Sequence, residues 1–218
     1  MPMLKYDLYI FDWDGTLMNT TQTIVDATTH ACRTLGLNLI SAELATSIIG
    51  KVFTQVIAEI IPELRSNPAL VQKFTAIYEQ YLNENALKNS LSACVLETLD
   101  KLTAAGKFIT LATGSSRARL NDILAATGLA HYFMLIKTAS ECFSKPHPQM
   151  IEEILDFTGM AKTQTVMIGD ASHDLQMAQN AGVDAIAISH RAQDYAELEF
   201  YNPRYVLRSI SELYELLV

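Results

Sequence analysis

The segment FDWDGT, residues 11–16, places two carboxylates directly behind an apolar run. Asp12 and Asp14 stand two positions apart after residues 6–11, whose β-branched and aromatic side chains predict a strand. Like charges this close repel each other, so a purely structural role explains the pair poorly. One carboxylate can act as a covalent nucleophile while the other, in a different environment, acts as general acid and base. The pair therefore predicts carboxylate catalysis at the end of a strand.

Three more polar segments follow predicted strands, at residues 113–116, 144–146 and 169–174. Because the carboxyl ends of parallel strands meet at one edge of a sheet, these segments and FDWDGT are expected to share a pocket. Segment 144–146 fits least well, since it lies several residues beyond its strand. The groups of interest are Thr113, Lys145, Asp170 and Asp174, together with the backbone at Gly114.

The acidic side chains of this pocket predict a divalent cation. Two aspartate pairs in a small volume would raise some of their own pKa values if nothing offset the charge. A cation resolves that conflict, and oxygen ligands without histidine or cysteine suit Mg²⁺. The candidate metal ligands are Asp12, Asp14, Asp170 and Asp174.

The remaining groups of the pocket suit a phosphate. Lys145, the Thr113 hydroxyl and free backbone amides near Gly114 supply positive potential and hydrogen-bond donors. This local attraction reconciles an anionic substrate with the net charge of −8. The expected chemistry is attack by Asp12 on phosphorus, which forms an aspartyl-phosphate, with Asp14 handling the proton.

Strands and helices alternate along most of the chain. Strands are predicted at residues 6–11, 108–113, 135–137, 165–168, 184–188 and 205–207. Helices are predicted at residues 116–127, 149–159 and 172–181. Such alternation predicts an α/β fold, a Rossmann-like parallel sheet with its site at the carboxyl ends of the strands.

One long stretch, from about residue 17 to residue 83, contains no convincing strand. Its amphipathic helical patterns cover residues 20–35, 41–49, 52–61 and 69–83. A simple crossover needs one helix, so we expect an inserted α-helical cap domain at 17–83. The Rossmann-like core domain would then be formed by residues 1–16 and 84–218.

The composition narrows the functional class. Half of the 218 residues are hydrophobic, the net charge is −8 and the sequence pI is near 5.1, which argues against nucleic acid as a partner. The three cysteines are far apart and odd in number, so we expect neither a disulfide framework nor a zinc site. We see no signal peptide and no apolar run long enough for a bilayer. We therefore expect a cytoplasmic protein that does not bind membranes.

Four motifs together resemble those of the haloacid dehalogenase-like hydrolases. They are DWDGT, FITLATG ending at Thr113, SKPHP around Lys145, and VMIGDASHD, in family order and with similar spacing over essentially the whole chain. The helical insertion resembles the C1-type cap of that family. The segments KPHPQMIEEIL and GDASHDLQMAQNAGVDAI are similar to the phosphoglycolate-phosphatase-like branch.

The resemblance implies a role for each matching residue. Asp12 corresponds to the nucleophile and a magnesium ligand, and Asp14 to the general acid and base, whose backbone carbonyl also reaches the metal. Thr113 and Lys145 correspond to the pair that holds the phosphate.

Two acids of the last motif correspond to the rest of the metal site. Asp170 matches the remaining direct ligand. Asp174 matches an acid that acts through water or orients Lys145. Both acids could equally stabilise the start of a helix, and that role is compatible with metal binding.

Several other residues could have either a functional or a structural role. Ser115, Ser116 and Arg117 could contact substrate or simply begin a helix. Lys51 in the cap is a candidate substrate contact, although a solvated surface lysine is the commoner case. His173, at a variable position of the last motif, is expected to face solvent.

The predicted function is a Mg²⁺-dependent phosphatase for a small phosphomonoester, such as phosphoglycolate or a sugar phosphate. Asp14 argues against two relatives by resemblance, the dehalogenases and the phosphonatases, which lack this second aspartate. A phosphosugar mutase would keep all four motifs and remains an alternative, as does a non-enzymatic signalling module that accepts phosphate on aspartate. The expected partner is a small phosphate ester, and the expected assembly is a monomer or small homo-oligomer.

Overall fold

The computed structural model describes residues 5–46 and 53–217. Within them, six parallel strands form a sheet with the order β3-β2-β1-β4-β5-β6. This is the Rossmann-like α/β core that the sequence predicts. The strands are β1 (Leu8–Phe11), β2 (Phe108–Thr113), β3 (Leu135–Thr138), β4 (Thr165–Gly169), β5 (Asp184–Ile188) and β6 (Tyr205–Leu207).

The central strands are continuous apolar runs because both faces of the sheet are covered. All four residues of β1 and all five of β4 are buried. The register sets Phe11 of β1 opposite Leu111 of β2 and Ile168 of β4. The residues that follow β2, β1 and β4 therefore begin side by side at the same edge of the sheet. β1 begins at Leu8, two residues later than predicted.

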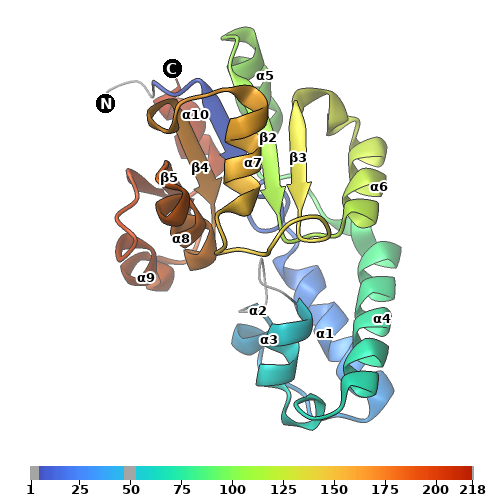
Figure 1. Ribbon diagram of the computed structural model, residues 1–218. Coiled ribbons are helices and arrows are strands. Elements are labelled where there is room, and N and C mark those ends of the chain that lie inside the picture. The colour runs from blue at the N-terminus through green and yellow to red at the C-terminus, as the bar shows by residue number, and fades with distance from the viewer. Residues whose placement is uncertain (1–4, 47–52, 218) are drawn as a thin grey trace.

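Helices pack on both faces of the sheet (Figure 1). Those that follow β2, β3 and β4 form as predicted, and each ends at a glycine in the left-handed region. The helices of one face are α5 (Val95–Ala104), α6 (Arg117–Thr127) and α10 (Ile210–Leu216). Those of the other are α7 (Gln149–Thr158), α8 (Ser172–Ala181) and α9 (Tyr195–Glu199). Short 3₁₀ turns occupy η1 (Pro62–Leu64), η2 (Ala86–Lys88), η3 (Leu129–Tyr132), η4 (Lys162–Gln164) and η5 (Ala192–Asp194).

The stretch between β1 and α5 is helical and has an apolar core of its own. Ile24, Ile57 and Phe74 are buried there, and the Phe53 ring stacks on Tyr78 with 3.9 Å between centroids. Figure 1 shows these helices beyond the carboxyl ends of the strands. They are α1 (Thr21–Leu35), α2 (Ala42–Thr46), α3 (Phe53–Ile60) and α4 (Pro68–Asn85). The helix predicted at 41–49 is described only as far as Thr46, since residues 47–52 lie outside the described part.

Two neighbouring chain segments join these helices to the sheet. The Asn19 amide donates to the Ser90 carbonyl, and the Ser92 amide to the Leu17 carbonyl, both at 2.9 Å. The Ser92 hydroxyl also donates to the Thr16 carbonyl at 2.8 Å. Both connections therefore run beside the residues that follow β1, close to the carboxylate pair.

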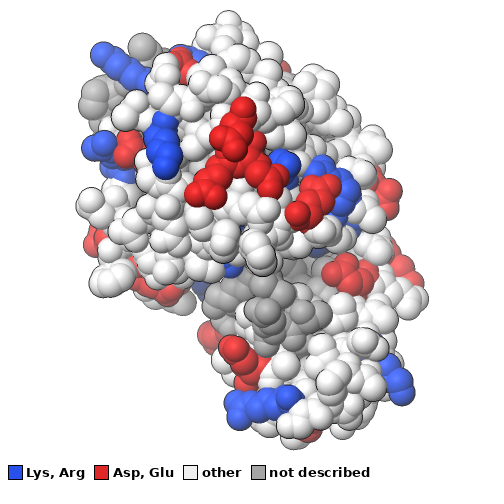
Figure 2. All heavy atoms as spheres, viewed as in Figure 1, with Lys and Arg blue, Asp and Glu red and all other residues white. Residues whose placement is uncertain are grey.

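The surface is acidic over α7. That helix carries Glu152, Glu153 and Asp156, and acidic side chains gather on this face in Figure 2. Among the described residues, no helix combines the length and apolar character needed to cross a membrane.

Candidate active site

Asp12 lies just beyond β1, where the sheet holds it firmly. Its backbone N–H donates to the Ile168 carbonyl of β4 at 2.8 Å, and the residue is only 1% exposed. Its Oδ1 accepts a hydrogen bond from Lys145 Nζ at 2.6 Å. Burial raises the pKa of Asp12 to about 7, an effect that Lys145 opposes and Asp174 increases. A carboxylate fixed in this way can serve as a nucleophile.

Lys145 bridges two carboxylates. Its Nζ lies 2.6 Å from Asp12 Oδ1 and 2.5 Å from Asp174 Oδ1. Asp174 Oδ2 accepts a hydrogen bond from the Ala171 amide at 3.2 Å, at the start of α8. Burial lowers the pKa of Lys145, but Asp12 and Asp174 outweigh it and the net shift is upward. Lys145 therefore stays charged, and its hydrogen bond to Asp174 is the contact that one of the two roles expected for Asp174 requires.

Three aspartates converge beside this lysine. One carboxylate oxygen from each of Asp12, Asp170 and Asp174 lies within 4.8 Å of the others. Asp170 directly follows β4, and its Oδ1 accepts a hydrogen bond from the Thr16 hydroxyl at 3.1 Å. Burial raises the pKa of Asp170 well above its usual value, and the other two aspartates raise it further. Lys145 offsets part of this negative charge, and a divalent cation would favour the charged form of all three carboxylates further.

Two glycines allow these carboxylates to sit so close to the backbone. A Cβ at Gly15 would lie 2.3 Å from Asp170 Oδ2, and one at Gly169 would lie 2.4 Å from Asp174 Cγ. Gly15 also has a φ of +90°, which only glycine adopts readily. The glycines of DWDGT and VMIGD are therefore part of the acidic site.

The donor set fits Mg²⁺. It consists of carboxylate oxygens, and neither imidazole nor thiolate joins it among the described residues. Hard oxygen ligands are those that Mg²⁺ prefers. Asp14 is a predicted ligand, but its carboxylate lies outside this group and has other hydrogen-bond partners. That its backbone carbonyl reaches the metal stays a prediction.

Asp14 forms a closed ring with two residues near the start of α6. Its Oδ2 accepts a hydrogen bond from the Ser115 hydroxyl at 2.5 Å. Its Oδ1 lies 3.1 Å from Nη2 of Arg119, while Nη1 of the same guanidinium lies 3.1 Å from Ser115 Oγ. All three residues are buried. The second carboxylate of the pair thus has an environment unlike that of Asp12.

Thr113 is the last residue of β2, next to β1 in the sheet. It is fully buried, and its Oγ1 accepts a hydrogen bond from the Ser115 amide at 3.1 Å. Gly114, which is half-buried, separates the two. The predicted phosphate-holding segment therefore begins at the same sheet edge as Asp12.

The sequence matches a known family across most of its length. The model for the haloacid dehalogenase-like hydrolases matches residues 9–188. The chain belongs to this family. The predicted family and fold are confirmed.

The similarity to named relatives extends over nearly the whole chain. A protein named pyrophosphatase PpaX, from Bacillus mycoides, is 28% identical over 98% of both chains. One named probable phosphatase IndB, from Dickeya dadantii, is 31% identical over 94% of this chain and 91% of its own. These relatives support the predicted assignment to the phosphoric monoester hydrolases.

Solved structures share the fold at lower identity. A haloacid dehalogenase-like family hydrolase from Streptococcus pneumoniae superposes with a TM-score of 0.83, 21% identity and coverage of 98% of this chain and 99% of its own. A predicted phosphoglycolate phosphatase from Haemophilus somnus gives a TM-score of 0.85, 21% identity and coverage of 99% and 100%.

Arg119 belongs to this hydrolase's site, although the sequence did not single it out. A signal was present: α6 turns Leu120, Ile123 and Leu124 to the core, and Arg119 shares that buried face. A charge on an apolar face needs a buried partner. The sequence could not name Asp14 as that partner, because the two are 105 positions apart.

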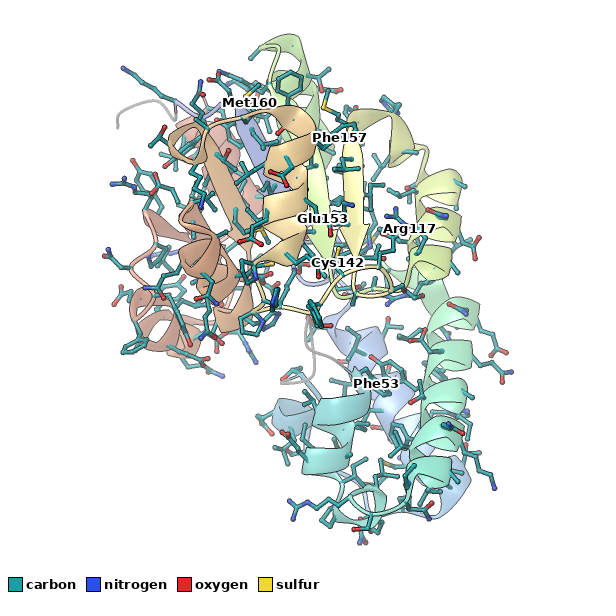
Figure 3. The ribbon with its side chains drawn as sticks, viewed as in Figure 1. Phe53, Arg117, Cys142, Glu153, Phe157 and Met160 are labelled. Carbon is teal, nitrogen blue, oxygen red and sulfur yellow. The ribbon has the colours of Figure 1, made fainter. Side chains whose placement is uncertain are left out.

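The open residues around the second motif have three different roles. Ser115 contacts Asp14, whereas the Ser116 side chain caps α6 by accepting from the Arg119 amide. Arg117 pairs with Glu141 at 2.6 Å and lies beside β3 at the edge of the sheet (Figure 3). Ser116 and Arg117 therefore have structural partners, and only Ser115 contacts a predicted catalytic residue.

The expectation that His173 faces solvent is wrong. The residue is 5% exposed, because the buried face of α8 includes it together with Asp174. Lys51, the predicted substrate contact in the insertion, lies outside the described residues.

A cavity of about 510 Å³ adjoins the acidic site. It is lined by Gly15 and Asp170 next to the three aspartates and extends past the end of β5 to His190. Glu43 and Thr46 of α2 form part of its wall. The helical insertion therefore borders the space beside the carboxylates.

Proposed function

We propose that this hydrolase is a Mg²⁺-dependent phosphatase that acts on a small phosphomonoester through an aspartyl-phosphate on Asp12. The observation that carries the proposal is the buried Asp12 carboxylate, 2.6 Å from Lys145 and grouped with Asp170 and Asp174. In this proposal the nucleophile Asp12, the cation Lys145 and the carboxylates that would hold the metal lie together at one edge of the sheet. Such a grouping can stabilise the charge that develops during phosphoryl transfer.

In the first step, a carboxylate oxygen of Asp12 forms a bond to phosphorus as the bond to the ester oxygen breaks. Asp14 gives its proton to the departing oxygen. In the second step, water attacks phosphorus, its proton passes to Asp14, and the bond to Asp12 breaks. Inorganic phosphate leaves, and both carboxylates return to their starting states.

The phosphate would be held by the groups around Asp12. Lys145 and the segment at Thr113 and Gly114 supply a charge and hydrogen-bond donors. The metal, held by Asp12, Asp170 and the Asp14 carbonyl, would supply positive charge against the phosphate oxygens. Asp174 would act mainly through Lys145, to which it is hydrogen-bonded.

The insertion would act as a cap over this site, as a domain at 17–83 set on a core of 1–16 and 84–218. Its own apolar core and its place beyond the strand ends support this division. A cap can exclude water while the aspartyl-phosphate forms, and must open to release product. Lys51 remains the proposed selector of substrates.

The proposed partner is a small anionic ester in the cytoplasm, attracted by Lys145 despite the net charge of −8. The acidic charge makes nucleic acid a poor partner, and membranes are not expected as partners. Pyrophosphate is a second candidate substrate, favoured by the names of the PpaX relatives. A mutase reaction differs only in whether sugar or water takes the phosphoryl group.

The test is release of phosphate from a panel of phosphoglycolate, sugar phosphates and pyrophosphate, with Mg²⁺ and with EDTA. We expect Mg²⁺-dependent turnover of at least one small monoester, which Asp12→Asn abolishes. Transfer between sugar positions without phosphate release would identify a mutase. Turnover of pyrophosphate alone would replace the monoester as substrate.

A further inference from the structure

We infer that Arg119 is a positioning residue that, with Ser115, holds the Asp14 carboxylate in the orientation needed for proton transfer. The inference rests on the proposed function in one respect, the assignment of Asp14 as the proton donor. It goes beyond the motif residues, because Arg119 lies outside all four motifs.

The ring of contacts restrains both oxygens of Asp14. Ser115 donates to Oδ2, Arg119 Nη2 donates to Oδ1, and Arg119 Nη1 donates to the Ser115 oxygen. A carboxylate with each oxygen tied to a different donor cannot rotate without breaking one of them. Each oxygen keeps a second lone-pair direction, so the group can still hold or receive a proton.

The ion pair between Arg119 and Asp14 is buried. Arg119 and Asp14 are 6% and 7% exposed, and Arg119 Nε has no hydrogen-bond acceptor among the described residues. Losing a charged partner leaves a buried guanidinium with an uncompensated charge. Asp14 supplies this partner in its ionised form, the form it has between the two proposed steps, and the two side chains then restrain each other.

The same guanidinium lies where the sheet's helices meet the insertion. Tyr78 and Glu79 of α4 are the other ionisable groups that interact with it. Burial raises the pKa of Glu79, and Arg119 opposes the rise. Arg119 thus lies within electrostatic range of both Asp14 and the ionisable groups of α4.

The experiment compares Arg119→Ala and Arg119→Lys with wild type, using kcat/KM for an alkyl phosphate and for p-nitrophenyl phosphate. This constant reports only steps through phosphorylation of Asp12, and p-nitrophenolate leaves without protonation. We expect Arg119→Ala to lose about 10²-fold on the alkyl ester, as misplaced groups do, and much less on the aryl ester. Arg119→Lys, which keeps the charge but not the fork, should fall between.

Chemical rescue separates positioning from folding. Guanidinium, far below denaturing concentrations, should restore part of the alkyl-ester activity of Arg119→Ala. The matched control is Arg117→Ala, which removes an arginine of the same helix paired with Glu141; it should keep the wild-type ratio between esters. If Arg119→Ala does not fold, Ser115→Ala and Arg119→Lys provide the same comparison.

Equal losses on both esters, or no loss, would overturn the inference. If wild type hydrolyses no ester, the proposed function fails, and a crystal structure of Arg119→Lys still decides the positioning role. We expect the Asp14 carboxylate to adopt a new orientation there while Asp12 and Asp170 stay in place. An unchanged Asp14 would contradict the inference without any measurement of turnover.

Discussion

At the scale of single residues, the site separates two carboxylates that are almost adjacent in the chain. Asp12 faces Lys145, and burial raises its pKa to about 7. Asp14 faces Ser115 and Arg119 instead. Neighbours in sequence thus have different partners, and the proposed mechanism, in which one attacks and the other transfers a proton, requires such a difference.

Replacing Asp12 by asparagine should remove turnover and leave the fold intact. The amide cannot attack phosphorus, so kcat should fall by several orders of magnitude. Phosphate release measures the loss, and thermal unfolding should show a Tm no lower than wild type, because burial disfavours the charged form that is removed. Asp156→Asn, on the exposed face of α7, is the control. Near-normal kinetics in Asp12→Asn would exclude the covalent mechanism.

Replacing Lys145 by methionine should destabilise the protein in the absence of metal. The change leaves Asp12 and Asp174 without their shared cation, and breaking a buried pair typically costs about 3–5 kcal/mol. Urea unfolding in EDTA measures the loss. Lys137→Met, which breaks the partly exposed pair with Glu153, should cost less than about 1 kcal/mol. Equal losses of unfolding free energy in the two variants would mean that burial does not increase the contribution of the Lys145 ion pairs to stability.

At the scale of elements, the turns after β1 and β4 bring the carboxylates together. The strands set the directions, but glycines 15 and 169 permit the close approach. A β-carbon at either position would collide with an aspartate of the site. The glycines of these two turns are therefore as necessary for the acidic group as the aspartates themselves.

Gly15→Ala should impair both stability and metal binding. The new Cβ would meet Asp170 Oδ2 at 2.3 Å, at a backbone φ of +90°. Gly36→Ala is the matched control, because its φ is +66° and a Cβ there meets nothing within 4 Å. The control should lose only the left-handed backbone penalty, about 1–2 kcal/mol, and keep its Mg²⁺ requirement. Urea unfolding and Mg²⁺ titration of activity distinguish the two; an unaltered Mg²⁺ requirement in Gly15→Ala would contradict the close approach.

At the scale of the whole molecule, a sheet and a helical insertion meet around the site. The acids belong to the sheet edge, while α2 lines the adjoining cavity and α4 carries residues that interact with Arg119. The proposed metal binding and the proposed limit on substrate size therefore both depend on the assembled chain.

Mg²⁺ should stabilise the folded protein, since the acidic group exists only when β1 and β4 are paired. At a concentration 100 times its Kd, the gain in unfolding free energy is about 2.7 kcal/mol. Thermal unfolding with Mg²⁺ and with EDTA measures it, and Asp170→Asn should remove most of it. Glu152→Gln, on exposed α7, should keep it. A Tm independent of Mg²⁺ would place the metal elsewhere or exclude it.

The proposed cap should restrict substrates to small esters. A cavity of about 510 Å³ accommodates a sugar phosphate but not a folded protein chain. We expect kcat/KM for small phosphomonoesters to exceed that for a folded phosphoprotein by orders of magnitude, measured as phosphate release. Rapid hydrolysis of the phosphoprotein would rule out the cap as a size filter.

The sequence by itself determined the strands, the helices after them and the motif residues at their ends. These features are local: a buried strand is a short apolar run, a helix ends at glycine, and a motif occupies consecutive positions. The predicted helix ranges did not include α5, α9 and α10. The Rossmann-like core follows because parallel strands joined by helices have few arrangements.

Only the tertiary structure decided which side chains meet. The sequence placed Lys145 and Asp12 in one pocket, but only the structure shows that Lys145 lies between Asp12 and Asp174. The contact of Arg119 with Asp14, 105 positions away, had no signal in the spacing of the chain. The burial of His173 and the collision that excludes a side chain at Gly15 likewise depend on neighbouring elements. These contacts depend on how helices pack against the sheet, and that packing assigns different partners to two aspartates that are two positions apart in the chain.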